Sequence, residues 1–173
     1  MSTPHGHPHP DPTLRVILLG ASNVKMGFPQ ILTRLRAGAG EPLEILAALG
    51  HGRSFGLWSH LLGIRQLPGI VDCRLWDDLG RRPPLPTVAL VTDVGNDLLY
   101  GASAPQIAGW VGTCLDRLAE RGAEIVLTLL PVASLVKVSP VRYHLVRSIL
   151  FPGRRAASWD AMLESVRELD ERL

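Results

Sequence analysis

Four short apolar runs, separated by more polar stretches, most constrain the fold of this chain. They cover residues 14–20, 43–50, 87–95 and 124–132. Each run has the length and the Leu, Val and Ile content of a strand buried on both faces, and continuous runs of this kind are typical of parallel strands. The sequence therefore predicts an α/β fold in which a parallel, doubly wound sheet of four strands lies between two helical layers.

Amphipathic segments between the runs supply the helices that this three-layer architecture requires. Residues 28–38, 104–122 and 156–173 have apolar positions at helical spacing, and residues 55–67 show a weaker pattern. The chain stops on the last of these helices, without the strand that would follow it. We therefore expect one domain over residues 13–173 that is C-terminally incomplete and lacks a fifth strand.

The composition is that of a packed soluble domain, with 46% hydrophobic and 20% charged residues. No stretch approaches the roughly 18 uninterrupted apolar residues of a membrane span. The N-terminus lacks the basic and apolar segments of a secretory signal. We expect a cytoplasmic protein without a membrane span.

Other partners and cofactors find little support in the residue pattern. Residues 1–12 alternate histidine with glycine and proline, which favours a disordered tail over a metal site. Cys73 and Cys114 share no metal-ligand or redox spacing, so we expect two buried, reduced thiols and no metal or organic cofactor. The sixteen arginines and two lysines are scattered, which argues against a nucleic-acid partner. No pattern indicates the oligomeric state.

Each of the first three runs leads into small and polar residues: GASN at 20–23, GHGRS at 50–54 and DVGND at 93–97. The carboxyl ends of parallel strands share one edge of a sheet, where ligands bind. A serine nucleophile needs small neighbours and donors aimed at the developing oxyanion. Ser22 offers a hydroxyl and its own N–H, Gly52 an unobstructed N–H, and Asn96 a side-chain NH₂.

Each of these residues also has a purely structural interpretation. Ser22 is a typical helix cap, Gly52 a typical turn residue, and Asp97 in the third loop a further cap. We expect Asp93 to orient its own loop by accepting hydrogen bonds from backbone amides. The occurrence of Ser22, Gly52 and Asn96 at three successive strand ends favours the catalytic interpretation.

Taken in order, the three motifs resemble the first three blocks of the SGNH, or GDSL-like, hydrolase superfamily over residues 14–132. GND is the most specific element, whereas Ala21 replaces the aspartate usual in the first block. The resemblance implies a flavodoxin-like hydrolase fold, with Ser22 as nucleophile and Gly52 and Asn96 as oxyanion donors. It implies a serine esterase that cleaves an acyl or acetyl ester of a small molecule through an acyl-serine intermediate.

The catalytic base of that family is a histidine in a C-terminal D-x-x-H block, and this sequence contains no D-x-x-H. We expect the block to lie beyond the last residue together with the fifth strand, which would leave the 173-residue chain nearly inactive. His51 is more typical of a loop residue or substrate contact, with a role as base left open. His60 is expected to be a packing residue, and His144 a surface or packing residue with a substrate contact left open. The region 133–155 is expected to cover one side of the pocket.

Two other classes of function stay open. A non-catalytic module would keep the oxyanion pocket without a base and bind an acyl or carbohydrate ligand. The coding sequence beyond Leu173 separates this module from the enzyme. A Rossmann-like nucleotide-binding domain also begins with GAS, but its loop needs further glycines, and NVKMG follows here at 23–27.

Overall fold

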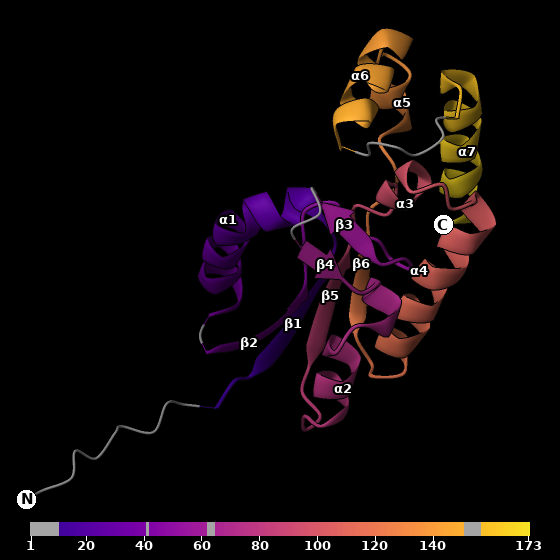
Figure 1. Ribbon diagram of the computed structural model, residues 1–173. Coiled ribbons are helices and arrows are strands. Elements are labelled where there is room, and N and C mark those ends of the chain that lie inside the picture. Colours follow the sequence, from indigo (N-terminus) through magenta and orange to yellow (C-terminus); the bar gives the residue numbers. More distant parts are fainter. Residues whose placement is uncertain (1–10, 41, 62–64, 151–156) are drawn as a thin grey trace, which may run out of the picture.

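The computed structural model describes residues 11–40, 42–61, 65–150 and 157–173 (Figure 1). Its centre is a parallel sheet of β1 (Leu14–Leu19), β2 (Leu43–Ala48), β5 (Thr87–Val91) and β6 (Glu124–Leu127). The strand order is β2-β1-β5-β6. Counted along the chain this is 2-1-3-4, as in the flavodoxin-like doubly wound arrangement. The predicted four-stranded α/β fold is therefore confirmed.

Helices cover both faces of the sheet (Figure 1). The helical elements are α1 (Ser22–Ala39), the short η1 (Ile70–Asp72), α2 (Leu75–Gly80), α3 (Asn96–Leu99), α4 (Ala104–Ala119), α5 (Val132–Leu135), α6 (Pro140–Leu150) and α7 (Trp159–Arg172). α1 covers one face, α2 and α4 lie on the other, and α7 packs against α4. The helices predicted at 28–38 and 104–122 are confirmed, as is the described part of the one predicted at 156–173.

The central strand β1 shows why the apolar runs are continuous. Ile17 and Leu19 belong to the hydrophobic core on the α4 side, whereas Val16 and Leu18 belong to the smaller core under α1. All four side chains are buried. Since both faces of β1 are covered, these four consecutive positions are all apolar, and the buried Arg15 before them is paired with Glu44.

The edge strand β6 departs from the prediction that every strand is buried on both faces. Its register with β5 places Val126 beside Leu90, on the α1 side of the sheet. Val126 is 57% exposed because α1 packs over β1, β2 and β5 and leaves β6 uncovered among the described elements. The opposite face of β6, with Ile125 and Leu127, packs against the larger core.

The helix predicted over residues 55–67 is wrong. The segment contains an antiparallel pair, β3 (Ser59–Leu61) and β4 (Arg65–Leu67), so that His60 lies on a strand. The backbones of Gly56 and Gly69 meet: a Cβ on Gly69 would lie 2.7 Å from the Gly56 carbonyl carbon. A helix of thirteen residues spans roughly 20 Å and would hold these two glycines apart.

The other predictions about single segments have mixed outcomes. Cys73 and Cys114 are free and buried, as expected. The helix α2 was not predicted. The proposed tail falls mostly on residues 1–10, which lie outside the described residues. None of the described helices is both long and apolar enough to cross a membrane.

Candidate active site

The three candidate loops leave the carboxyl ends of β1, β2 and β5, which are neighbours in the sheet. Ser22 is the first residue of α1, Gly52 lies in a turn after β2, and Asn96 is the first residue of α3. All three residues are half-buried. The strand order thus puts the three loops along one edge of the sheet, where a parallel sheet binds its ligands.

The loop that carries Ser22 is held by the carboxylate of Asp93. One carboxylate oxygen accepts hydrogen bonds from the backbone N–H groups of Ala21, at 3.0 Å, and of Asn23, at 3.1 Å. The other accepts from the Asn23 side-chain amide at 2.7 Å. Asp93 therefore caps α1 from the third loop. Ser22 lies between Ala21 and Asn23, whose backbone N–H groups both donate to the Asp93 carboxylate.

This cap corrects the role expected for Asp93, which accepts amides of the first loop instead of its own. It also explains why α1 begins at Ser22, six residues before the predicted helix: no side chain within the loop caps it. Asp93 adopts φ +60°, and among the described non-glycine residues it alone has a positive φ. Aspartate tolerates this left-handed region better than most residues do.

The loop that carries Gly52 forms a tight turn. The Arg53 N–H donates to the Gly50 carbonyl at 3.3 Å, and Gly52 has φ +60°, which suits the third position of a type II turn. The Tyr100 hydroxyl donates to the Gly52 carbonyl at 2.6 Å. Within the described ranges the Gly52 N–H donates to no acceptor, so its hydrogen remains available.

A buried carboxylate joins the second and third loops. Asp97, on the first turn of α3, is fully buried and accepts hydrogen bonds from the Ser54 hydroxyl and from the Phe55 N–H, the latter at 2.9 Å. The Ser54 oxygen in turn accepts from the Leu57 N–H at 2.7 Å. Burial raises the pKa of Asp97, and the hydrogen bonds from Ser54 and Phe55 offset part of that rise.

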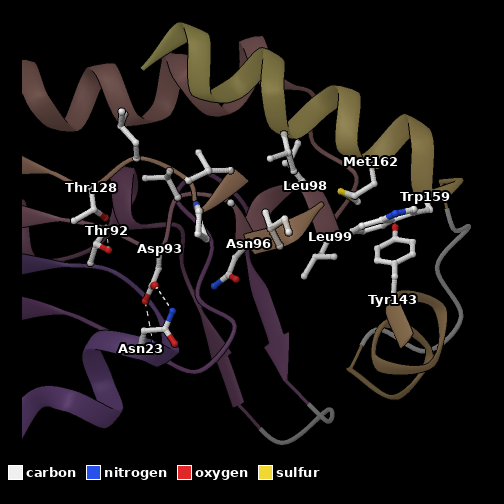
Figure 2. A pocket seen from close by; sticks show the side chains of 17 residues that line it. Asn23, Thr92, Asp93, Asn96, Leu98, Leu99, Thr128, Tyr143, Trp159 and Met162 are labelled. Atoms are coloured by element: carbon white, nitrogen blue, oxygen red, sulfur yellow. Dashed lines mark hydrogen bonds between the residues drawn. The ribbon is translucent and has the colours of Figure 1, made fainter. Parts of the chain in front are cut away.

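A cavity of about 550 Å³ opens beside the third loop (Figure 2). It is lined by Asn23, Thr92, Asp93, Val94, Gly95, Asn96, Leu98, Leu99, Thr128, Leu129, Leu130, Pro131, Leu135, Tyr143, Trp159, Met162 and Val166. Figure 2 shows Asn23 and Asp93 at one end and Tyr143, Trp159 and Met162 at the other, with Asn96 between. The cavity therefore has a polar end and an apolar end.

The structure brings only part of the predicted site into this cavity. Asn96 lines it, whereas Ser22 and Gly52 are not among the described lining residues. Leu135 and Tyr143, from the region predicted to cover one side of the pocket, line this cavity. The convergence of Ser22, Gly52 and Asn96 on one point stays a prediction.

The described residues provide no base hydrogen-bonded to Ser22. His51 is exposed in the turn beside Gly52, and the exposed His144 on α6 contacts the ring of Tyr143 edge-on, with 4.9 Å between ring centroids. The side chain of His60 lies outside the described residues. No group of three or more potential metal-ligating side chains occurs in the described part of the chain.

Two polar contacts that hold the second loop are not predicted from the sequence: those of Ser54 with Asp97 and of Tyr100 with Gly52. The signals were weak. Asp97 stands in the GND motif, whose pattern is equally typical of a helix cap, and Tyr100 follows it on the next turn. Their partners lie more than forty residues earlier, so no local pattern connects them.

Comparisons with known proteins add a structural similarity. No family model and no curated protein matches the sequence. Among solved structures the chain is similar to one described as the crystal structure of TesA, at 15% sequence identity and a TM-score of 0.46. The alignment covers 92% of this chain and 99% of that one.

Proposed function

We propose that this chain carries the nucleophile and the oxyanion donors of a serine esterase-type hydrolase that acts on small-molecule esters. The observation that carries the proposal is the Asp93 cap, which holds Ser22 at the start of α1. Asn96 follows three residues after Asp93 and lines the cavity at the same edge of the sheet. The resemblance of the three motifs to the SGNH hydrolases supplies the roles.

In the proposed reaction the Ser22 oxygen attacks the ester carbonyl carbon while a base takes the serine proton. The N–H groups of Ser22 and Gly52 and the Asn96 amide stabilise the tetrahedral oxyanion. The intermediate expels the alcohol, which receives the proton from the base. Water, whose proton the base takes, then attacks the acyl-serine, and the free acid leaves as the base returns that proton to the Ser22 oxygen. The resemblance implies a histidine of a D-x-x-H block as this base, and none of the described histidines is hydrogen-bonded to Ser22.

The position of Ser22 on α1 supports a role in stabilising negative charge. It is the first residue of an 18-residue helix, whose N-terminus carries partial positive charge and free N–H groups. An oxyanion that forms at the Ser22 side chain lies near these donors. The capping carboxylate of Asp93 offsets part of this field, so the donors of Gly52 and Asn96 remain necessary.

The cavity beside Asn96 supports an acyl group with an apolar portion as substrate. Leu98, Leu99 and Met162 provide apolar contacts beyond the Asn96 amide, and Trp159 lies at the same apolar end (Figure 2). Burial of an alkyl chain contributes about 0.8 kcal/mol per methylene. Esters with medium-length acyl chains are therefore expected to be hydrolysed faster than acetate esters.

The test compares p-nitrophenyl acetate and octanoate hydrolysis by the full-length protein that contains this chain and by its Ser22→Ala variant. We expect the substitution to lower kcat by at least about 10³-fold without changing the thermal melting curve. Ser134→Ala, which changes an exposed serine on α5, is the matched control and should retain wild-type turnover. Equal turnover in the wild type and in Ser22→Ala would reject the proposal.

A non-catalytic acyl-binding module is the second candidate. It is favoured by the absence, within the described residues, of a histidine bonded to Ser22. Such a module would bind octanoate at the cavity with no ester turnover by the full-length protein. Calorimetric titration of octanoate, combined with the esterase assay on the same sample, separates the two functions.

A further inference from the structure

Arg53, in the turn after β2, is buried without an adequate partner. The residue is only 7% exposed. Its terminal nitrogens reach the carbonyls of Leu49 and Pro68 at 3.4 Å each, beyond the usual hydrogen-bond range, and its Nε has no hydrogen-bond partner. Across the described residues, no carboxylate forms an ion pair with this guanidinium.

A charge in this position is unfavourable unless an anion accompanies it. Burial lowers the pKa of Arg53, and the neighbouring Cys73 opposes that shift. An arginine nevertheless remains protonated in proteins, so the buried side chain keeps its positive charge. Two long contacts to carbonyl oxygens and one to the Cys73 side chain leave its Nε without a partner.

Arg53 lines a second cavity, of about 300 Å³, between β2 and α2. Arg74 and Asp78 are the other charged residues that line it. Asp78 is already paired with Arg81 at 2.5 Å, and its contact with Arg74 is long, at 3.7 Å. The Arg74 side chain is 83% exposed, which leaves it able to turn toward a bound anion.

We infer that this second cavity binds a small molecule bearing an oxyanion, a phosphate or a carboxylate, held by Arg53 and Arg74. The planar guanidinium fork matches either group with two parallel hydrogen bonds. The cavity volume corresponds to about ten water molecules of the liquid. It is larger than a bare phosphate and leaves room for an organic portion of the ligand. Leu46, Ala48 and Leu75 provide apolar walls for it. The site shares no lining residue with the cavity beside Asn96 and does not depend on the proposed esterase activity.

The test is calorimetric titration of the protein with inorganic phosphate, glycerol 3-phosphate and succinate at constant ionic strength. We expect saturable binding of at least one of them. Tighter binding of glycerol 3-phosphate than of phosphate identifies an organic carrier, equal binding identifies the free anion, and preference for succinate identifies a carboxylate. Failure of all three to bind saturably overturns the inference.

Two substitutions assign the binding to this cavity. Arg74→Gln, at an exposed position, should weaken binding at least tenfold without affecting the fold. Arg53→Gln should abolish binding, and circular dichroism shows whether that variant is folded; if it is not, Arg74→Gln alone decides. Arg34→Gln, which removes an exposed arginine on α1, is the matched control. An equal loss in Arg34→Gln and Arg74→Gln, or no loss in Arg74→Gln, overturns the inference.

Discussion

Asp93 and Asn23, seventy residues apart in the sequence, are joined by two hydrogen bonds: the carboxylate accepts from the Asn23 backbone at 3.1 Å and from its side-chain amide at 2.7 Å. This pair connects the loops that follow β1 and β5. It sets where α1 begins, and with it the position of Ser22. A residue of the third loop, Asp93, therefore holds the first loop of the candidate site in place.

Asp93→Ala is expected to destabilise the protein by about 1–2 kcal/mol, because the N-terminus of α1 loses its cap. It should also lower kcat, since Ser22 is no longer held. Urea denaturation and ester hydrolysis measure the two effects. Asparagine at this position tolerates the positive φ and keeps one acceptor oxygen. The stability and the kcat of Asp93→Asn should therefore lie between those of the wild type and those of Asp93→Ala. Wild-type kcat in Asp93→Ala would contradict this role.

Asn96→Ala is expected to lower kcat by about 10²–10³-fold, the usual effect of removing one oxyanion donor. The KM should change little, because the donor acts mainly on charge that develops in the transition state. Thr128→Ala, at the same cavity, serves as control and should retain kcat. A KM increase with unchanged kcat would make Asn96 a substrate-binding residue only.

Ser54 and Asp97 are expected to be energetically coupled. Ser54→Ala and Asp97→Asn should each destabilise the protein, by about 1–3 kcal/mol, because each leaves a buried polar group without its partner. In the double variant, the second substitution should lower the free energy of unfolding by less than it does on its own. Urea denaturation of the four proteins measures this coupling, and strict additivity would show that the contact is unimportant for stability.

Glu44 is expected to give the protein an acid-sensitive stability. Burial alone would raise the pKa of Glu44, but the hydrogen bonds and charges of Arg15 and Arg82 outweigh it and place the pKa below its ordinary value. A lowered pKa in the folded state stabilises the protein above the unfolded pKa, about 4.3. That stabilisation is lost as the pH falls through the folded pKa.

Glu44→Gln should therefore lower the free energy of unfolding by about 1–3 kcal/mol at pH 7, and the difference from wild type should shrink below pH 4. Thermal melts between pH 3 and 7 measure this trend. Catalysis should be unaffected, because Glu44 lies near the start of β2, at the edge of the sheet opposite the candidate site. A difference that stays constant with pH would contradict the assignment.

Leu99→Trp is expected to fill the apolar end of the cavity beside Asn96. Hydrolysis of p-nitrophenyl octanoate should fall at least tenfold, whereas hydrolysis of the acetate should change by less than about threefold, since one methylene in a pocket contributes about 1–3 kcal/mol. Val136→Trp, at an exposed position outside the cavity lining, is the control. Equal loss for both esters would place the acyl chain elsewhere.

The sequence by itself determined the α/β class and the positions of β1, β2, β5 and β6. Their apolar runs are local, and a strand buried in the middle of a sheet leaves that pattern wherever it occurs. The same local patterns located α4 and most of α7. They also put a hydroxyl, a glycine and a carboxamide directly after three of the strands, which is why the candidate site was visible as a motif.

Only the tertiary structure decided how those loops are held and which surfaces stay open. The caps and links of Asp93, Asp97 and Tyr100 join residues forty to seventy positions apart, and no periodicity records such a contact. The exposure of Val126 depends on how far α1 reaches across the sheet, and the β3–β4 pair depends on the meeting of two glycine backbones. Local composition predicts a strand or a helix, but burial and hydrogen-bond pairing depend on what the rest of the chain places beside it.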